Sequence, residues 1–462
     1  MQIVLTKVPD YDIIMCGMWT MTDTKNQMGR ESGMRRKIYF WVKENVNSDT
    51  VRLAILAIPL TVVLVLQIVK GEINWMEFLD VSILVTFVIL AVCDAIANLV
   101  QKIVSEKAED SAKLITDYKK LTQKYQCTNL ISYVNAAPQK EENKNVLYPE
   151  ECLWMRTRAD EQILIQDEAE KFYNLPAQVM EHSGVIMEAH RASTVYNQIN
   201  IRLDDLTADP AENTLTLCTS RTQYFDSLLT NRACDYVFSD RKITIREMFE
   251  PGPYIKPLSL SKMSNHLGFN GFVMTSDRQS IPFILRRKNM SIGKGLWGTS
   301  IGASLKTMYA LDAAQGFKMN ETSLGRAIIG ELKDELNIKK DRAFMRNEHE
   351  YDPRKVQDSI FAFYRDLVEC GKPQFLFCLQ LENTTEAQLS SFFAEKGKKD
   401  KNDVKTDGDE VRFFTIEQLK NAEYHIDKIV IDGNEYPMSP SYIISVILLL
   451  EYMKNRSQQL SA

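Results

Sequence analysis

The sequence predicts a two-helix transmembrane hairpin that is joined by a helical stalk to an α+β domain, and three observations lead to this fold class. Two long apolar runs occupy residues 51–69 and 78–100. Residues 101–126 contain no proline or glycine and favour a helix. Alternating apolar residues around a turn at residues 268–289 indicate a β-hairpin, and a helical pattern begins near Ser323.

Length and composition limit the classes of protein to consider. A chain of 462 residues exceeds the size of most single hydrophobic cores, so at least two structural units are expected. The net charge of -5 argues against a protein coated with nucleic acid, although a local basic pocket for a small anion is compatible with it. The eight cysteines are scattered, without the spacing of a zinc site or a disulfide framework.

The first apolar run, residues 51–69, predicts a transmembrane helix. At about 1.5 Å per residue it is long enough to cross a hydrocarbon core of about 30 Å, and its one charge, Arg52, lies at its edge. Pro59 is tolerated within a membrane span and would kink the helix. The alternative is a helix buried in a globular core.

The second apolar run, residues 78–100, follows a short connector and predicts the antiparallel partner of the first. Basic residues flank the outer ends of both runs, whereas the connector carries only Lys70. Because positive charge favours the cytosolic side, both termini are expected in the cytosol. Asp94 and Asn98 in the second run either line a pore within a helix bundle or lie at the membrane interface.

The rest of the chain divides by composition. The predicted regions are an N-terminal cytosolic segment (1–50), the two spans (51–100), a helical stalk (101–135), a middle region (136–257) and a compact C-terminal domain (258–462).

The middle region offers local structure but no chemical motif. Residues 161–171 favour a helix, and residues 214–220 favour a strand. His182 and His190 are expected to be ordinary surface or packed residues rather than ligands.

The helical pattern near Ser323 carries glycine and acidic residues in a recognisable order. Gly316 is followed by Glu331, Leu332, Asp334, Glu335 and Ile338. This order resembles the signature of the Nudix family: a glycine, a glutamate and then an Arg-Glu-apolar-x-Glu-Glu-x-Gly-apolar run on a loop-helix-loop. The departures are Thr322 beside Glu321 at the first glutamate position, Gly330 at the arginine position and Asn337 at the final glycine.

Helix geometry indicates what the three acids could do. Glu331 and Glu335 are four residues apart and Asp334 is three from Glu331, so their carboxylates share one face and could hold Mg²⁺. In the family the arginine orients the acids, so Gly330 leaves their geometry unsupported. We therefore treat them as vestigial catalytic residues, and as metal ligands if any metal is bound, with no cofactor required. The alternative is a solvated acidic face on a packed helix.

The resemblance continues toward the C-terminus. Residues 375–379 and 411–419 resemble later strands of the Nudix fold, and residues 440–453 resemble its closing helix. The resemblance implies an α+β domain in which helices sandwich a mixed sheet.

The combination of two spans, a stalk and a degenerate Nudix-like domain is similar to the SMODS-associated Nudix family, the transmembrane effectors of the cyclic-oligonucleotide-based antiphage signalling system (CBASS). This resemblance implies that a partner nucleotidyltransferase (CD-NTase) makes a cyclic oligonucleotide, which the Nudix-like domain binds without hydrolysing it. The helices of a homo-oligomer would then disrupt the bacterial inner membrane, in which the chain is a multi-pass protein, and cause abortive infection.

The residues between the hairpin and the helix offer candidate ligand contacts. Arg286, Arg287 and Lys294 can donate charge-assisted hydrogen bonds to phosphate, and Trp297 and Phe413 can stack on bases. Arg286 and Arg287 must point to opposite faces of a strand, so at most one of the two is expected to face the ligand.

Two other functions fit the same features. One is a membrane-tethered Nudix hydrolase of a nucleoside diphosphate derivative, with Mg²⁺ on the three acids. Turnover that Glu335→Gln abolishes would favour it. The other is a nucleotide-inhibited channel of the Hailong type, for which adding the ligand should protect the membrane.

Overall fold

The computed structural model places most of the chain beyond residue 112. It describes residues 65, 69, 113–115, 117–126, 130–134, 145–190, 197–238, 241–277, 279–286, 295–311, 313, 316–338, 353–399 and 408–461. The chain divides into two units, residues 1–103 and 104–462. Only Val65 and Val69 of the first unit are described, so the fold below is that of the second.

The predicted transmembrane hairpin is not found in the described part of the chain. Within the ranges given above, no helix is long and apolar enough to cross a membrane. The helix α16 (Pro440–Ser461) has 22 residues, but from Glu451 onward it is mainly polar and exposed, whereas a span needs about 20 predominantly apolar residues. The fold class is therefore corrected to an α+β protein with mixed sheets.

This correction extends to two further predictions that depend on the hairpin. A multi-pass location in the inner membrane and a pore as the output are corrected with it, because no helix in the described ranges could cross a membrane. The membrane as a partner and the nucleotide-inhibited channel stay predictions. Of the predicted spans 51–69 and 78–100, all residues but Val65 and Val69 lie outside the described residues. Asp94 and Asn98 are among those outside, so the structure assigns them no place.

The predicted stalk, residues 101–135, differs in its described part from one continuous helix. Residues 113–115 are not helical, α5 (Tyr118–Lys124) is a short helix, and β1 (Leu130–Val134) is a strand. Tertiary packing explains the difference, because Leu121 and Tyr125 are buried against the rest of the fold.

The main sheet has six strands and combines segments that are far apart in the sequence. Its order is β1–β2–β10–β11–β6–β9, in which β11 and β6 run parallel and the other neighbours antiparallel. The remaining strands are β2 (Asn145–Met155), β6 (Gly268–Met274), β9 (Ile301–Ser304), β10 (Ile360–Asp366) and β11 (Lys372–Gln380). Because β2 pairs with β10, residues on both sides of the predicted boundary at residue 258 contribute to this sheet.

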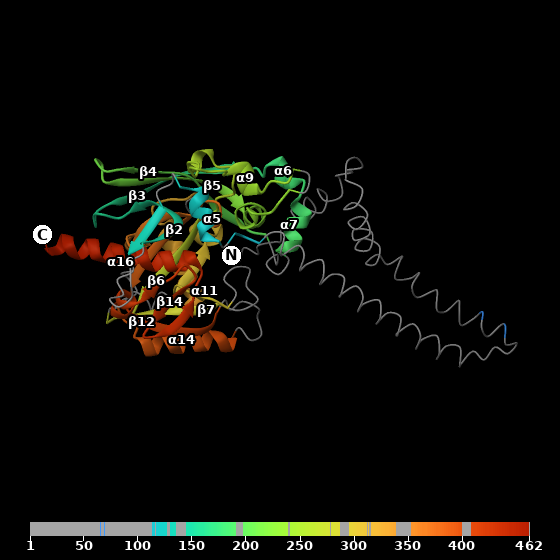
Figure 1. The fold of residues 1–462 in the computed structure, drawn as a ribbon. Helices are drawn as coiled ribbons and strands as arrows, with labels where there is room; N and C mark the ends of the chain where they lie inside the picture. Colours follow the sequence, from blue (N-terminus) through green and yellow to red (C-terminus); the bar gives the residue numbers. More distant parts are fainter. Residues whose placement is uncertain are drawn as a thin grey trace. The chain divides into compact units, whose positions relative to one another are not determined.

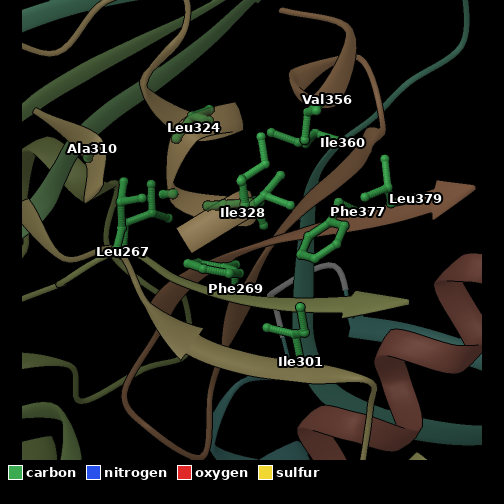
Figure 2. Close-up of a cluster of buried hydrophobic side chains, with 14 of the residues drawn as sticks. Leu267, Phe269, Ile301, Ala310, Leu324, Ile328, Val356, Ile360, Phe377 and Leu379 are labelled. Carbon is green, nitrogen blue, oxygen red and sulfur yellow. The ribbon is translucent and has the colours of Figure 1, made fainter. Parts of the chain in front are cut away.

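Helices cover both faces of this sheet. Side chains alternate along a strand, so Phe269 of β6 packs with α11 (Ser323–Leu336), whereas Phe272 packs with α16. Figure 2 shows Ile328 of α11 directed toward Phe269 and Phe377 of the sheet. The result is a helix–sheet–helix arrangement with one apolar core on each side of the sheet; α11, α16, β2 and β6 are labelled in Figure 1.

Three smaller sheets complete the fold. They are β12 (Gly408–Thr415)–β7 (Ser280–Arg286)–β8 (Trp297–Gly298), β3 (Gln162–Phe172)–β5 (Thr214–Gln223)–β4 (Ile199–Asp209) and β13 (Glu423–Tyr424)–β14 (Lys428–Ile431)–β15 (Asn434–Pro437). The predicted hairpin at residues 268–289 therefore supplies two different sheets, since β6 and β7 do not pair with each other.

Two local predictions in the middle region have opposite outcomes. The strand predicted at residues 214–220 is confirmed as part of β5. The helix predicted at residues 161–171 is wrong, because this segment is strand β3, which pairs in parallel with β5. Its burial alternates over the first residues, as a half-buried strand requires.

Short helices connect these strands. They are α6 (Ala177–Met180), α7 (Ser183–Ala189), α8 (Tyr224–Leu229), α9 (Ile245–Phe249), α10 (Thr307–Ala310), α13 (Pro353–Gln357), α14 (Glu386–Lys399), α15 (Ile416–Asn421) and the 3-10 turns Asn231–Ala233 and Leu258–Leu260. His182 precedes α7 and packs on Phe238 with ring centroids 5.0 Å apart, so it is a packed residue.

Candidate functional site

The acidic helix α11 is fixed at both ends by residues of the predicted signature. Gly316 precedes it with φ of 69°, a left-handed conformation that favours glycine. Asn337 ends it with φ of 55°, and asparagine is one of the few other residues that adopt this conformation readily. Asn337, which stands where the resembled signature has a glycine, therefore adopts the left-handed conformation that ends the helix.

The three acids of α11 differ in their exposure. The Glu331 side chain is 1% exposed, Glu335 is half-buried and Asp334 is exposed. In the part of the chain that the structure describes, no group of three or more acidic, histidine or cysteine residues is arranged to hold a metal ion. The three carboxylates lie on one face of the helix, as the sequence predicts, but they do not converge on one point.

A lysine from outside the signature occupies the acidic face of α11. Lys306, the residue before α10, places its Nζ 2.7 Å from Oε1 of Glu331. Burial lowers the pKa of Lys306, but the charge of Glu331 and the hydrogen bond to it raise that pKa more, and the other two carboxylates act in the same direction. The net effect is a pKa above the ordinary value, so Lys306 is an ammonium at neutral pH.

A tyrosine covers the position where the family has its arginine. A Cβ atom added to Gly330 would lie 2.5 Å from Cγ of Tyr309, so the Tyr309 ring occupies the space of a side chain at this position. The Tyr309 hydroxyl donates a hydrogen bond to Oδ2 of Asp334. The Lys306 ammonium lies 5.6 Å from the centroid of the same ring.

Helix α10, which presents Tyr309, is attached to α11 by an arginine. Nη2 of Arg326 donates a hydrogen bond of 2.7 Å to the carbonyl of Ala310, and Nη1 donates one to the hydroxyl of Thr322. Arg326 therefore bridges the end of α10 and the start of α11. Neither Lys306 nor Tyr309 was predicted as a site residue; the one sequence signal was the missing arginine at Gly330.

The two aromatic residues among the predicted ligand contacts lie in different cores. Trp297 is buried with α16 on one side of the sheet, whereas Phe413 is half-buried and packs with the core that contains α11. The two rings therefore do not form one stacking platform. Arg286 lies at the end of β7, and Arg287 and Lys294 lie outside the described residues.

Two arginines instead contact aromatic residues near the start of α16. Nη1 of Arg286 donates a hydrogen bond of 3.0 Å to the Tyr442 hydroxyl. Nη1 of Arg412 donates one of 2.7 Å to the Tyr436 hydroxyl, and its guanidinium lies 6.0 Å from the ring centroid of Trp297. Arg412, which is 47% exposed, was not singled out in the sequence, although it neighbours Phe413.

A second group of charged side chains is buried where β2 and β10 meet. Glu150 and Asp366 are opposite each other on these strands, and both are buried. Burial, and then the charge of Glu369, raise the pKa of Asp366 to about 7. Burial, and then the charge of Asp366, raise that of Glu150 well above its ordinary range. Lys372 forms an ion pair of 3.1 Å with Glu369 beside them.

Comparison with other proteins gives no further assignment. No protein-family model matches the chain, and no curated protein is similar to it in sequence. The function is therefore inferred from three features: the acidic face of α11, the buried charged cluster where β2 and β10 meet, and the arginine and aromatic residues around α16.

Proposed function

We propose that this chain is the sensor of a bacterial antiphage signalling system, which binds a cyclic oligonucleotide made by a partner nucleotidyltransferase and does not hydrolyse it. The membrane output expected from the sequence is not part of this proposal. Ligand binding instead acts through association between copies of the chain.

The observation that carries the proposal is the state of the acidic helix. The helix α11 and the turn that ends it are retained beside a mixed sheet. Its acids, however, are already bound, because Lys306 forms an ion pair with Glu331 and Tyr309 donates a hydrogen bond to Asp334. A hydrolase needs those carboxylates for chemistry, whereas a sensor needs only the domain that presents the ligand surface. A messenger that must persist is best read by such a domain.

The residues around the start of α16 support a phosphate-linked ligand. Arg286 and Arg412 are both held by tyrosine hydroxyls, so each guanidinium is oriented before a ligand arrives. An oriented guanidinium forms bidentate, charge-assisted hydrogen bonds to phosphate with little loss of side-chain entropy. We therefore assign the phosphate contacts to Arg286 and Arg412.

Calorimetric titration of the full chain with cyclic dinucleotides and trinucleotides tests the proposal. We expect binding of at least one cyclic oligonucleotide, with the ligand recovered intact by mass spectrometry and a change in oligomeric state by light scattering. Arg412→Ala should weaken binding about tenfold or more. Arg158→Ala is the matched control, because Arg158 is exposed and pairs with Asp160 rather than with a tyrosine hydroxyl.

Two results would contradict the proposal. Absence of binding to every cyclic oligonucleotide tested would remove the sensor function. Turnover of a nucleotide that requires Mg²⁺ and is abolished by Glu335→Gln would favour the hydrolase instead.

A further inference from the structure

We infer that Lys306 is a built-in counter-cation of α11 and that it excludes a divalent metal ion from the three carboxylates. The Nudix resemblance implies Mg²⁺ on Glu331, Asp334 and Glu335, and the residues present do not fit that ion. The inference deepens the proposed function by explaining the absence of turnover, but the charge arrangement itself does not depend on any ligand.

The ammonium of Lys306 is held against one of the three acids. Lys306 forms its ion pair with Glu331, the most buried of the three acids, and the side chains of the pair are 23% and 1% exposed. A single positive charge is therefore already placed against the most buried of the groups that would coordinate the metal.

The charge of Lys306 opposes the binding of a metal ion by the three acids. Two cations a few ångströms apart repel each other strongly in a partly buried site. A divalent ion could be held by these acids only if the ammonium left Glu331.

Tyr309 supports the same arrangement through contacts with Asp334 and Gly330. Its hydroxyl holds Asp334, and its ring fills the space at Gly330 that the family's arginine side chain would need. Lys306 and Tyr309, which flank the first residues of α10, therefore stabilise two of the acids without a metal and without the arginine. The departure at Gly330 and the presence of Tyr309 are parts of one arrangement.

Titration of the full chain with Mn²⁺, followed by electron paramagnetic resonance, tests this inference. The wild-type chain should show no Mn²⁺ binding that depends on Glu335. Lys306→Met should gain a Glu335-dependent Mn²⁺ site that binds at least about tenfold more tightly than any residual binding by the wild type, because the repelling charge is gone. Adding Glu335→Gln to Lys306→Met should abolish this gain.

Two further variants keep the test decisive. Lys306→Arg retains the positive charge and should resemble the wild type, even if Lys306→Met is poorly folded. Lys333→Met removes an exposed lysine from the same helix and should not change Mn²⁺ binding.

Wild-type binding of Mn²⁺ that Glu335→Gln removes would overturn the inference. Equal Mn²⁺ binding by Lys306→Met and the wild type, or a gain in Lys306→Arg equal to that in Lys306→Met, would also overturn it. None of these results bears on oligonucleotide binding by Arg286 and Arg412, so failure here is distinguishable from failure of the sensor function.

Discussion

Two groups of carboxylates lie in this domain, and the protein neutralises them in different ways. On α11, the buried Glu331 is paired with the ammonium of Lys306. In the main sheet, Glu150 and Asp366 are opposite each other, and burial raises the pKa of both. A carboxylate beside a fixed cation remains charged, whereas one buried beside another carboxylate tends to keep a proton.

The difference teaches how each region should respond to its surroundings. On α11 the charge of Glu331 is balanced by an ion pair with one side chain, so the loss of that cation is the change that should matter most. The sheet cluster should be sensitive to pH near neutrality, because Asp366 titrates there. The first region therefore depends on one cation, and the second contributes a pH-dependent part of the stability.

The largest expected effect comes from removing the fixed cation. Lys306→Met leaves Glu331 buried without its ion-pair partner, and we expect a loss of about 3–5 kcal/mol in the free energy of unfolding at pH 7. Urea denaturation measures this loss. Adding Glu331→Gln should recover part of it, and a loss below about 1 kcal/mol would show that the pair behaves as an exposed one.

The next effect is the pH dependence of the sheet cluster. The pKa of Asp366 is about 7 in the folded chain, against an ordinary value of 3.8. The folded chain therefore holds a proton that the unfolded chain releases, so this stabilisation is complete below about pH 4 and is lost as the pH rises to about 7.

Asp366→Asn should remove this contribution. Relative to the variant, the wild type should lose about 1–4 kcal/mol between pH 4 and 7. Urea denaturation across that pH range measures the difference between the two chains. A difference that stays constant with pH would show that Asp366 does not titrate there.

A smaller effect is expected at the position of the missing arginine. Gly330→Ala would place Cβ against the Tyr309 ring, at a cost of about 1–3 kcal/mol. At an open position within a helix the same substitution stabilises by about 1 kcal/mol. Destabilisation would therefore show that the Tyr309 ring fills the space at Gly330, and stabilisation would show that it does not. Thermal denaturation of Gly330→Ala, with and without Tyr309→Ala, provides the measurement.

The smallest effect is expected at Arg412, which belongs to neither carboxylate group. Arg412→Lys loses the stacking of a planar guanidinium on Trp297 and Tyr436, which we expect to cost about 0.5–1 kcal/mol of stability. A destabilisation as large as that of Lys306→Met in the same urea assay would contradict the contrast between a surface contact and a buried ion pair.

The sequence predicted local elements better than their partners. Helix α11 and strand β5 were found from periodicity, because their patterns are strong and local. Strand β3 was mistaken for a helix because its segment is rich in Glu and Gln residues, and its pairing with the distant strand β5 is not visible in the local sequence. The main sheet could not be predicted because β2 pairs with β10 across some 200 residues.

The candidate site shows the same limit. The acids were located from their spacing, but Lys306 and Tyr309 precede Glu331 by more than 20 residues and carry no motif. Gly330 was recognised as a departure, yet its cause is a contact with Tyr309 that only the folded chain reveals. The membrane prediction, made from hydropathy alone, is not supported by any helix in the described ranges.

Crystals of the chain soaked in Mn²⁺ give the most direct test of the α11 arrangement. Anomalous difference density should show no ion beside Glu331, Asp334 or Glu335, with the Lys306 ammonium still paired to Glu331. An ion coordinated by two of these carboxylates, with Lys306 displaced, would contradict the central claim.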